Sequence, residues 1–180
     1  TMAHLDLVSI ERPPAFVEAE LVPGSATTVY GIAGWFDADL GGGVKLDTSD
    51  GTVRVVPAYT RGDTRWGLPA LIHMMERAAK KVAKKSPGSL LGVGDISHKN
   101  GGDIFLHRSH ESGRDADIAF YVVDQRGKNL LPDTFVTFQG SIESSSMPGA
   151  RFDVPRNCAL VQAMLEDPIA RVSHIFVADP

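Results

Sequence analysis

The sequence predicts an α+β fold, with a mostly antiparallel sheet and flanking helices. Short apolar runs are bounded by clusters of turn residues, which is typical of strands. Two other segments repeat apolar residues at helical spacing. The order along the chain is strands, helix, strand, strand, helix, strand, which favours helices packed on one sheet.

The first half of the chain is expected to hold two extended segments and one long helix. Residues 1–24 form a lead-in with several prolines, and residues 27–33 and 52–59 are expected to be strands or extended segments separated by turns. A helix is expected over 68–85, because Pro69 suits a first turn and apolar side chains recur every three or four residues. The side chains expected in the core are Leu71, Ile72, Met75, Ala78, Ala79 and Val82.

The second half is expected to hold three strands and a second helix. Residues 89–97, 116–124 and 171–178 are short and apolar, and each predicts a strand. Residues 139–152 predict a polar loop, after which Asp153 has the position of a helix N-cap, with proline just inside the helix. The apolar face expected for that helix comprises Val154, Cys158, Val161, Met164 and Leu165.

Composition and charge limit the classes of partner. Hydrophobic residues make up 43% of the 180 residues, enough for a sizeable core. The net charge of -4 and the pI of about 5.8 argue against a nucleic-acid binder, which would usually be basic. A basic cluster on the first helix is interleaved with alanines and indicates a solvated helix face. It comprises Lys80, Lys81, Lys84 and Lys85.

The single cysteine, the hydropathy pattern and one glycine motif limit the possible functions further. Cys158 excludes a disulfide within the chain, and its apolar helical surroundings predict a buried thiol. No apolar run approaches the length of a membrane span, and no signal peptide is visible. The “GVG” at 92–94 lacks the third glycine of a dinucleotide-binding fingerprint.

The stretch “HRSHESGRDADIAFY”, which begins at His107, concentrates candidate metal ligands. Zn²⁺ binds imidazole and carboxylate groups, and a catalytic zinc site uses three protein ligands and a water. A turn at Gly113 would bring His110 back beside Asp115 and Asp117, which share one strand face because side chains alternate. From the spacing alone two interpretations are open: a divalent-metal site, or loop and strand-edge residues that bind no ion.

The other histidines give weaker signals. His98 lies in a glycine-bearing loop and is expected to be solvated or to line a cleft. His174 lies inside the last predicted strand, so a core or sheet-face position is expected. His4 and His73 have no partner in the sequence and are expected at the surface or in helix packing.

Four segments, in this order, resemble the penicillin-insensitive murein endopeptidases: “RWGLPALIHMMERAA”, “LLGVGDIS”, “HRSHESGRDADIAFY” and “RVSHIFVADP”. The resemblance covers roughly residues 60–180 and is most specific over 107–120. That family belongs to a wider group of zinc peptidases, which includes lysostaphin, the D-alanyl-D-alanine dipeptidases and the hedgehog amino-terminal domain. The resemblance implies a zinc peptidase domain of that fold over residues 25–180.

The local motif of these endopeptidases is close to S-H-x-x-G-x-D-x-D-I. Its counterparts in this chain are Ser109, His110, Gly113, Asp115, Asp117 and Ile118. The resemblance implies that His110 and Asp117 are zinc ligands, and that Asp115 and Ser109 support the ligands without binding the ion. His107 matches a family histidine that contributes to an additional metal site, so it is a further candidate ligand; the alternative is a histidine of the loop or the substrate cleft.

The wider group also carries an H-x-H motif, and none occurs in this chain. In the family it follows the segment that matches “IFV”, so the third ligand and the catalytic base are expected beyond Pro180. One interpretation is a longer peptidase whose C-terminal part is missing here. The other is a protein that has lost the motif and binds without cleaving. We favour the first, because the chain stops directly after a predicted core strand.

The resemblance implies a zinc metallopeptidase that cleaves peptide cross-links of peptidoglycan. The usual family target is the bond between D-alanine and meso-diaminopimelate, attacked by a metal-activated water. Such a mechanism has no nucleophilic serine for β-lactams to acylate. The substrate implies a periplasmic location. Two rival hypotheses are a non-catalytic module on the same fold, which binds cell wall or protein, and a metal-free α+β domain.

Overall fold

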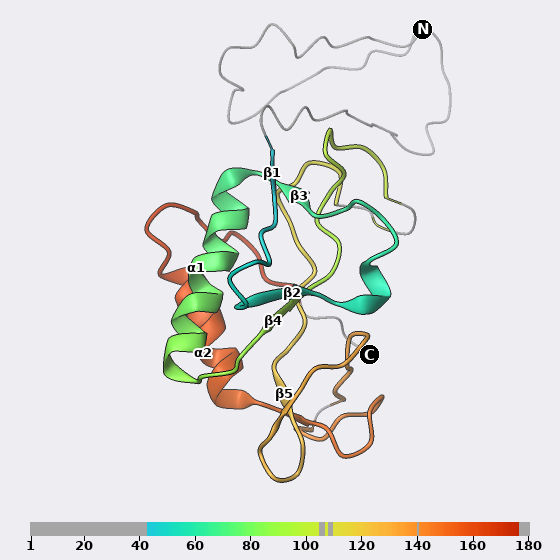
Figure 1. Cartoon of the computed structure of the whole chain (residues 1–180), viewed down its shortest axis with the longest axis vertical. Helices are drawn as coiled ribbons and strands as arrows, with labels where there is room; N and C mark the ends of the chain where they lie inside the picture. The colour runs from blue at the N-terminus through green and yellow to red at the C-terminus, as the bar shows by residue number, and fades with distance from the viewer. Residues whose placement is uncertain (1–42, 105–106, 108–109, 140, 177–180) are drawn as a thin grey trace, which may run out of the picture. The chain divides into compact units, whose positions relative to one another are not determined.

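The computed structural model describes residues 43–104, 107, 110–139 and 141–176. The expected lead-in and the strand predicted at 27–33 lie outside these residues. The described part has two α-helices, one 3-10 helix and short strands, which confirms the predicted α+β class (Figure 1).

Strand pairing in the described residues is mostly antiparallel, as predicted, but it is divided among three small sheets. β1 (Val44–Lys45) and β3 (Trp66–Gly67) form one antiparallel pair. A second antiparallel sheet has β5 (Val122–Val123) at its centre and β6 (Asn129–Leu130) and β7 (Arg151–Phe152) at its edges. Each of these five strands is two residues long, so backbone pairing is broken up by loops.

The third sheet is parallel, and its second strand leads along the chain into the candidate site. It pairs β2 (Val53–Val55) with β4 (Leu91–Val93). Both strands lie within predicted extended segments, and all of β4 is buried. The 3-10 helix η1 (Pro57–Tyr59) follows β2, because Pro57 ends the strand that the sequence predicted to continue to residue 59.

The first helix confirms its prediction. α1 (Pro69–Lys85) begins at the expected proline and buries Ile72, Met75 and Val82. The four lysines of its basic cluster are exposed, and Lys80 pairs with Asp50 at 3.0 Å. This face is therefore solvated, as its alternation with alanine predicts.

The second helix is in the predicted place but presents a different face to the core. α2 (Val154–Leu165) is capped by Asp153, whose side chain accepts a hydrogen bond from the backbone N–H of Arg156. The amide of Asn157 accepts from Tyr121 N at 2.9 Å and donates to Tyr121 O at 2.8 Å. These two bonds fix the rotation of the helix about its axis. As a result the polar residue Asn157 is buried on the face that is turned toward the rest of the domain. The buried apolar side chains are Leu160, Ala163 and Met164.

The prediction of a buried Cys158 is therefore wrong. Cys158 is exposed, as are Val154, Val161 and Leu165, which lie on the same face of α2. The sequence pattern placed these residues in the core because they are apolar. The hydrogen bonds of Asn157 turn them toward solvent instead.

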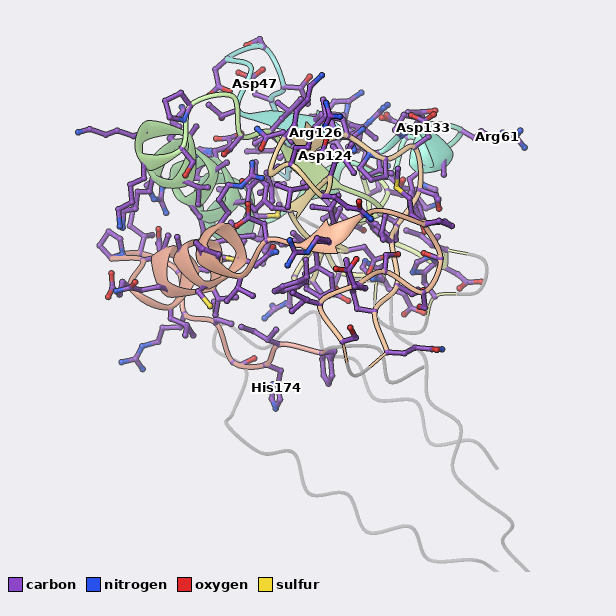
Figure 2. The ribbon with its side chains drawn as sticks, turned by 90° about the horizontal axis from the view of Figure 1, so that it is seen from below. Asp47, Arg61, Asp124, Arg126, Asp133 and His174 are labelled. Atoms are coloured by element: carbon purple, nitrogen blue, oxygen red, sulfur yellow. The ribbon has the colours of Figure 1, made fainter. Side chains whose placement is uncertain are left out.

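The strand predicted over residues 171–178 is also wrong for the residues that the structure describes. Residues 171–176 form no strand, and no described strand pairs with them. His174 is exposed rather than in a core or on a sheet, and its ring stacks on Phe176 at 5.7 Å. Figure 2 shows His174 pointing outward. Without a pairing partner this apolar run forms no strand, and only Val172 of residues 171–176 packs against the core.

One hydrophobic core holds these elements together. It lies between the two helices, which pack side by side (Figure 1), and the strands β2 and β4. Its members with no exposed surface include Ile72, Met75, Leu91 and Ile96. Within the described part of the chain, neither helix is long and apolar enough to cross a membrane.

Candidate metal centre

Two backbone segments bring the carboxylates of the candidate site together. The chain after β4 runs antiparallel to residues 117–119, with Gly94 N donating to Asp117 O at 2.8 Å. Asp117 N in turn donates to Asp95 O at 2.9 Å. Asp95 and Asp117 thus come from neighbouring backbones at the end of a buried strand.

His110 reaches the same place through the turn that the sequence predicts. Gly113 has φ 62°, and its carbonyl accepts from Leu68 N at the start of α1, which anchors the turn. His110 is buried, with 6% of its surface exposed, and its Nδ1 lies 3.1 Å from Ile96 O. A carbonyl can only accept, so in the neutral ring Nδ1 carries the proton and Nε2 has a free lone pair.

The free nitrogen of His110 faces the two aspartates. Nε2 lies 3.2 Å from Asp117 Oδ1 and 3.7 Å from Asp115 Oδ2. Burial lowers the pKa of His110, but the hydrogen bond and charge of Asp117, the charge of Asp115 and the Ile96 carbonyl outweigh it. The net result is a pKa above 6.5, so the surroundings of Nε2 favour positive charge.

His107 lies on the other side of Asp117. Its ring meets that of His110 edge-on, with centroids 4.7 Å apart. His107 Nδ1 lies 3.7 Å from Asp117 Oδ2, and Nε2 lies 3.4 Å from Asp95 Oδ2. The Asp117 carboxylate is therefore placed between two imidazoles.

The structure brings together all three residues that the sequence singled out as candidate ligands. One ligand atom each from His107, His110 and Asp117 lies within 4.8 Å of the others. Asp115 is beside them, and Ser109 lies outside the described residues. Sequence reasoning missed Asp95. A carboxylate directly after a buried apolar strand, as in “GVGDIS”, is the signal that could have found it.

This donor set fits a divalent cation such as zinc. Ligand atoms about 2.0–2.1 Å from a tetrahedral ion lie about 3.3 Å from one another. The 3.2 Å between His110 Nε2 and Asp117 Oδ1 already has this value, and the other oxygen of the same carboxylate, Asp117 Oδ2, lies 3.7 Å from His107 Nδ1. Three carboxylates, with Asp95 and Asp115 included, surround two imidazoles. Their excess negative charge favours a bound cation.

An aromatic pair adjoins the carboxylates. Tyr59 in η1 packs on Phe135 with ring centroids 4.6 Å apart. The Phe135 ring lies against Gly94, where an added Cβ would be 2.7 Å from Phe135 Cζ and 3.2 Å from Asp117 Cβ. Burial, and then the charges of Asp117 and Asp95, raise the pKa of Tyr59. Gly94 is therefore the residue that lets aromatic rings approach the centre.

The remaining described histidines do not join this cluster. His98 is half-buried in its loop, and His73 is exposed on α1. Among the residues that the structure describes, the group of His107, His110 and Asp117 is the one whose donor atoms come close enough for a shared ion.

Fold and site together define a class: a small α+β domain that gathers two imidazoles and a carboxylate at the end of a buried strand, in a geometry that suits one divalent cation. The chain belongs to the penicillin-insensitive murein endopeptidase family, whose model matches residues 39–177. This match confirms the resemblance carried by the four sequence segments. It makes the chain a member of a peptidase family that acts on murein, the peptidoglycan of the cell wall. A comparison with the curated proteins gives no match.

Proposed function

We propose that this protein is a zinc metallopeptidase that hydrolyses peptide cross-links of peptidoglycan, with His107, His110 and Asp117 as zinc ligands. Family membership supplies the endopeptidase reaction and the murein substrate. The observation that carries the zinc assignment is the pair His110 Nε2 and Asp117 Oδ1, 3.2 Å apart. The Ile96 carbonyl at Nδ1 leaves Nε2 free to bind a metal.

Bound zinc would lower the pKa of a coordinated water toward ~7 and polarise the scissile carbonyl. The protein's own residues prepare the place for that chemistry. Two neutral imidazoles and one carboxylate leave a net positive charge on a divalent ion, which keeps it electrophilic. Asp115 Oδ2, 3.7 Å from His110 Nε2 and half-buried, would add negative charge beside the ion without serving as a ligand. We assign no catalytic base.

We further propose that the bond cleaved joins D-alanine to meso-diaminopimelate, and that the protein works in the periplasm. Both proposals rest on family membership, because the resemblance implies this cross-link and because murein lies in that compartment. The aromatic pair of Tyr59 and Phe135 gives an apolar wall beside the candidate ligands, against which a peptide stem can lie.

The test uses the intact natural protein and purified peptidoglycan. Soluble products are separated by chromatography and identified by mass spectrometry. We expect cross-linked dimers to disappear and monomers with a free diaminopimelate amino group to form. A chelator should abolish this activity, and added zinc should restore it. The variant His110→Ala should be inactive, whereas His73→Ala, on the exposed face of α1, should behave as the unmodified protein.

Two other outcomes separate the alternatives. Cleavage that is unchanged by chelator would overturn the zinc assignment while keeping the peptidase. Binding to peptidoglycan with no cleavage, at any zinc concentration, would favour the non-catalytic module on the same fold.

A further inference from the structure

We propose that Asp95, held in place by Thr64, is a positioning residue that orients His107 for the metal centre. The inference rests on the proposed function, because it assigns a cause to the ligand role of His107. The family resemblance assigned no role to either Asp95 or Thr64.

The first observation is that each nitrogen of His107 faces a different carboxylate. Nε2 lies 3.4 Å from Asp95 Oδ2, and Nδ1 lies 3.7 Å from Asp117 Oδ2. Asp117 also contacts His110, so Nδ1 is the nitrogen on the side of the metal cluster. Asp95 therefore contacts Nε2, the ring nitrogen on the side away from the metal cluster.

The second observation is that Asp95 is itself fixed. The hydroxyl of Thr64 donates a hydrogen bond to Asp95 Oδ1, which leaves Oδ2 toward His107. Thr64 is buried, with 4% of its surface exposed, and its carbonyl accepts from Ile96 N at 2.8 Å and Ser97 N at 3.0 Å. The Asp95 side chain is 14% exposed, so water competes little for its oxygens.

These contacts select one form of the His107 ring. An acceptor at Nε2 favours the tautomer that carries its proton there, which leaves the lone pair on Nδ1. A carboxylate in this position also fixes the ring orientation and makes the other nitrogen a stronger ligand. Ile96 O does the same for His110, but at Nδ1. The two rings thus present opposite nitrogens to the one carboxylate of Asp117.

Two measurements on the intact natural protein test the inference. Two-bond ¹H–¹⁵N spectra of the metal-free protein report the tautomer of each histidine, and titration with Co²⁺ reports ligand geometry through its visible absorption and affinity. The variant Asp95→Asn keeps the shape of the side chain but offers an amide that can donate to Nε2. We expect His107 to lose its Nε2–H preference, the Co²⁺ spectrum to change and the affinity to fall about 10–100-fold.

The matched control is Asp133→Asn, an exposed carboxylate (Figure 2), which should leave the tautomers and the Co²⁺ spectrum unchanged. A second pair of variants addresses Thr64 in case Asp95→Asn folds poorly. Thr64→Val removes the hydroxyl and should reproduce the loss in part, whereas Thr64→Ser keeps the hydroxyl and should retain the normal spectrum.

The outcomes distinguish this inference from the proposed function. If the unmodified protein binds Co²⁺ and Asp95→Asn shows the same tautomer, spectrum and affinity, the positioning role is overturned and the metal centre stands. If the unmodified protein takes up no Co²⁺, the proposed metal centre is overturned, and the positioning role with it.

Discussion

His110 is the least exposed member of the candidate metal centre and contacts two aspartates through one nitrogen. Its side chain is 8% exposed, compared with 24% for His107 and 32% for Asp117. A buried imidazole with one nitrogen fixed by a carbonyl has a single orientation in which it can bind a metal. The behaviour of this residue should therefore dominate the chemistry of the site.

The pH dependence of zinc binding follows from His110. Its pKa is raised above 6.5, so as the pH falls the ring begins to take up a proton at a pH above 6.5. A metal that binds the ring must then displace this proton. Zinc affinity should therefore be greatest in mildly alkaline solution and should begin to fall at a pH above 6.5, by up to about tenfold per pH unit for one proton. Competition with a coloured chelator between pH 8.5 and 6 measures this fall. An affinity that does not change over that range would contradict the assignment of His110 as a ligand.

The folding stability of the metal-free protein should depend on pH in the opposite direction, falling as the pH rises. A group whose pKa is raised on folding stabilises the folded state at pH values below its unfolded value of about 6.5. This contribution is lost as pH rises through the folded value. A proton on His110 thus stabilises the folded protein at lower pH, and bound zinc would stabilise it at higher pH.

At the scale of single residues the sequence predicted the candidate ligands, but not the residues that hold those ligands in position. His110 and Asp117 could be paired because a seven-residue spacing with a glycine turn is a local pattern. Asp95 and Thr64 are 31 residues apart, and Asp95 meets His107 only because two backbone segments pair. Contacts of this kind depend on the tertiary fold, so no local spacing in the sequence predicts them.

At the scale of single elements, the start of α2 combines a cap with a buried ion pair. Asp153 accepts from Arg156 N at 3.0 Å and from Arg156 Nε at 2.6 Å, and both side chains are largely buried. Asp153→Ala should destabilise the protein by about 3 kcal/mol or more, because it removes the cap and leaves a buried guanidinium unpaired. Asp153→Asn keeps the cap and should cost less. Chemical denaturation of both variants tests this, and equal losses would contradict it.

Gly94, directly after β4, is a position where the packing beside the metal centre leaves no room for a side chain. An added Cβ would overlap Phe135 and press on Asp117, so Gly94→Ala should lower both stability and metal affinity. If the overlap with Phe135 is the main cause, Phe135→Ala should offset much of the loss in the double variant. A double-mutant cycle on thermal stability and zinc affinity measures this coupling. Strictly additive losses would show that the ring is not the obstacle.

The sequence predicted helices better than strands, for a physical reason. α1 and the cap of α2 depend on neighbouring residues, and both are where the sequence placed them. The rotation of α2 depends on hydrogen bonds between Asn157 and Tyr121, 36 residues apart. Of the five side chains that hydrophobicity alone placed in the core, Met164 is buried and the other four are exposed. Residues 171–176 looked like a core strand, but a strand needs a partner as well as apolar side chains.

At the scale of the whole described domain, one ion pair links the two helical regions. Arg77 in α1 donates from Nε and from its second guanidinium nitrogen to the two oxygens of Asp167, just after α2, at 2.8 Å each. The Asp167 side chain is 2% exposed. The Arg77 hydrogen bonds, aided by the backbone N–H groups of Ala170 and Ile169, hold the pKa of Asp167 well below 3.8.

This pair should make the domain sensitive to acid. A carboxyl group whose pKa is lowered on folding stabilises the protein above its unfolded value, and the contribution is lost as pH falls through the folded value. Asp167→Asn should therefore cost about 1.5–3 kcal/mol at pH 7 and progressively less as the pH falls below 3.8. Melting temperatures of both proteins over this range measure the difference. A constant difference at all pH values would contradict the role of the charge.

The central claim is that His110 and Asp117 hold a zinc ion in a murein endopeptidase. The most direct test is elemental analysis of the intact natural protein, purified without chelator, beside His110→Ala and Asp117→Ala. We predict about one zinc per chain in the unmodified protein and little in either variant, as expected when a protein ligand is lost. A zinc content near zero in the unmodified protein, or an equal content in all three, would contradict the account.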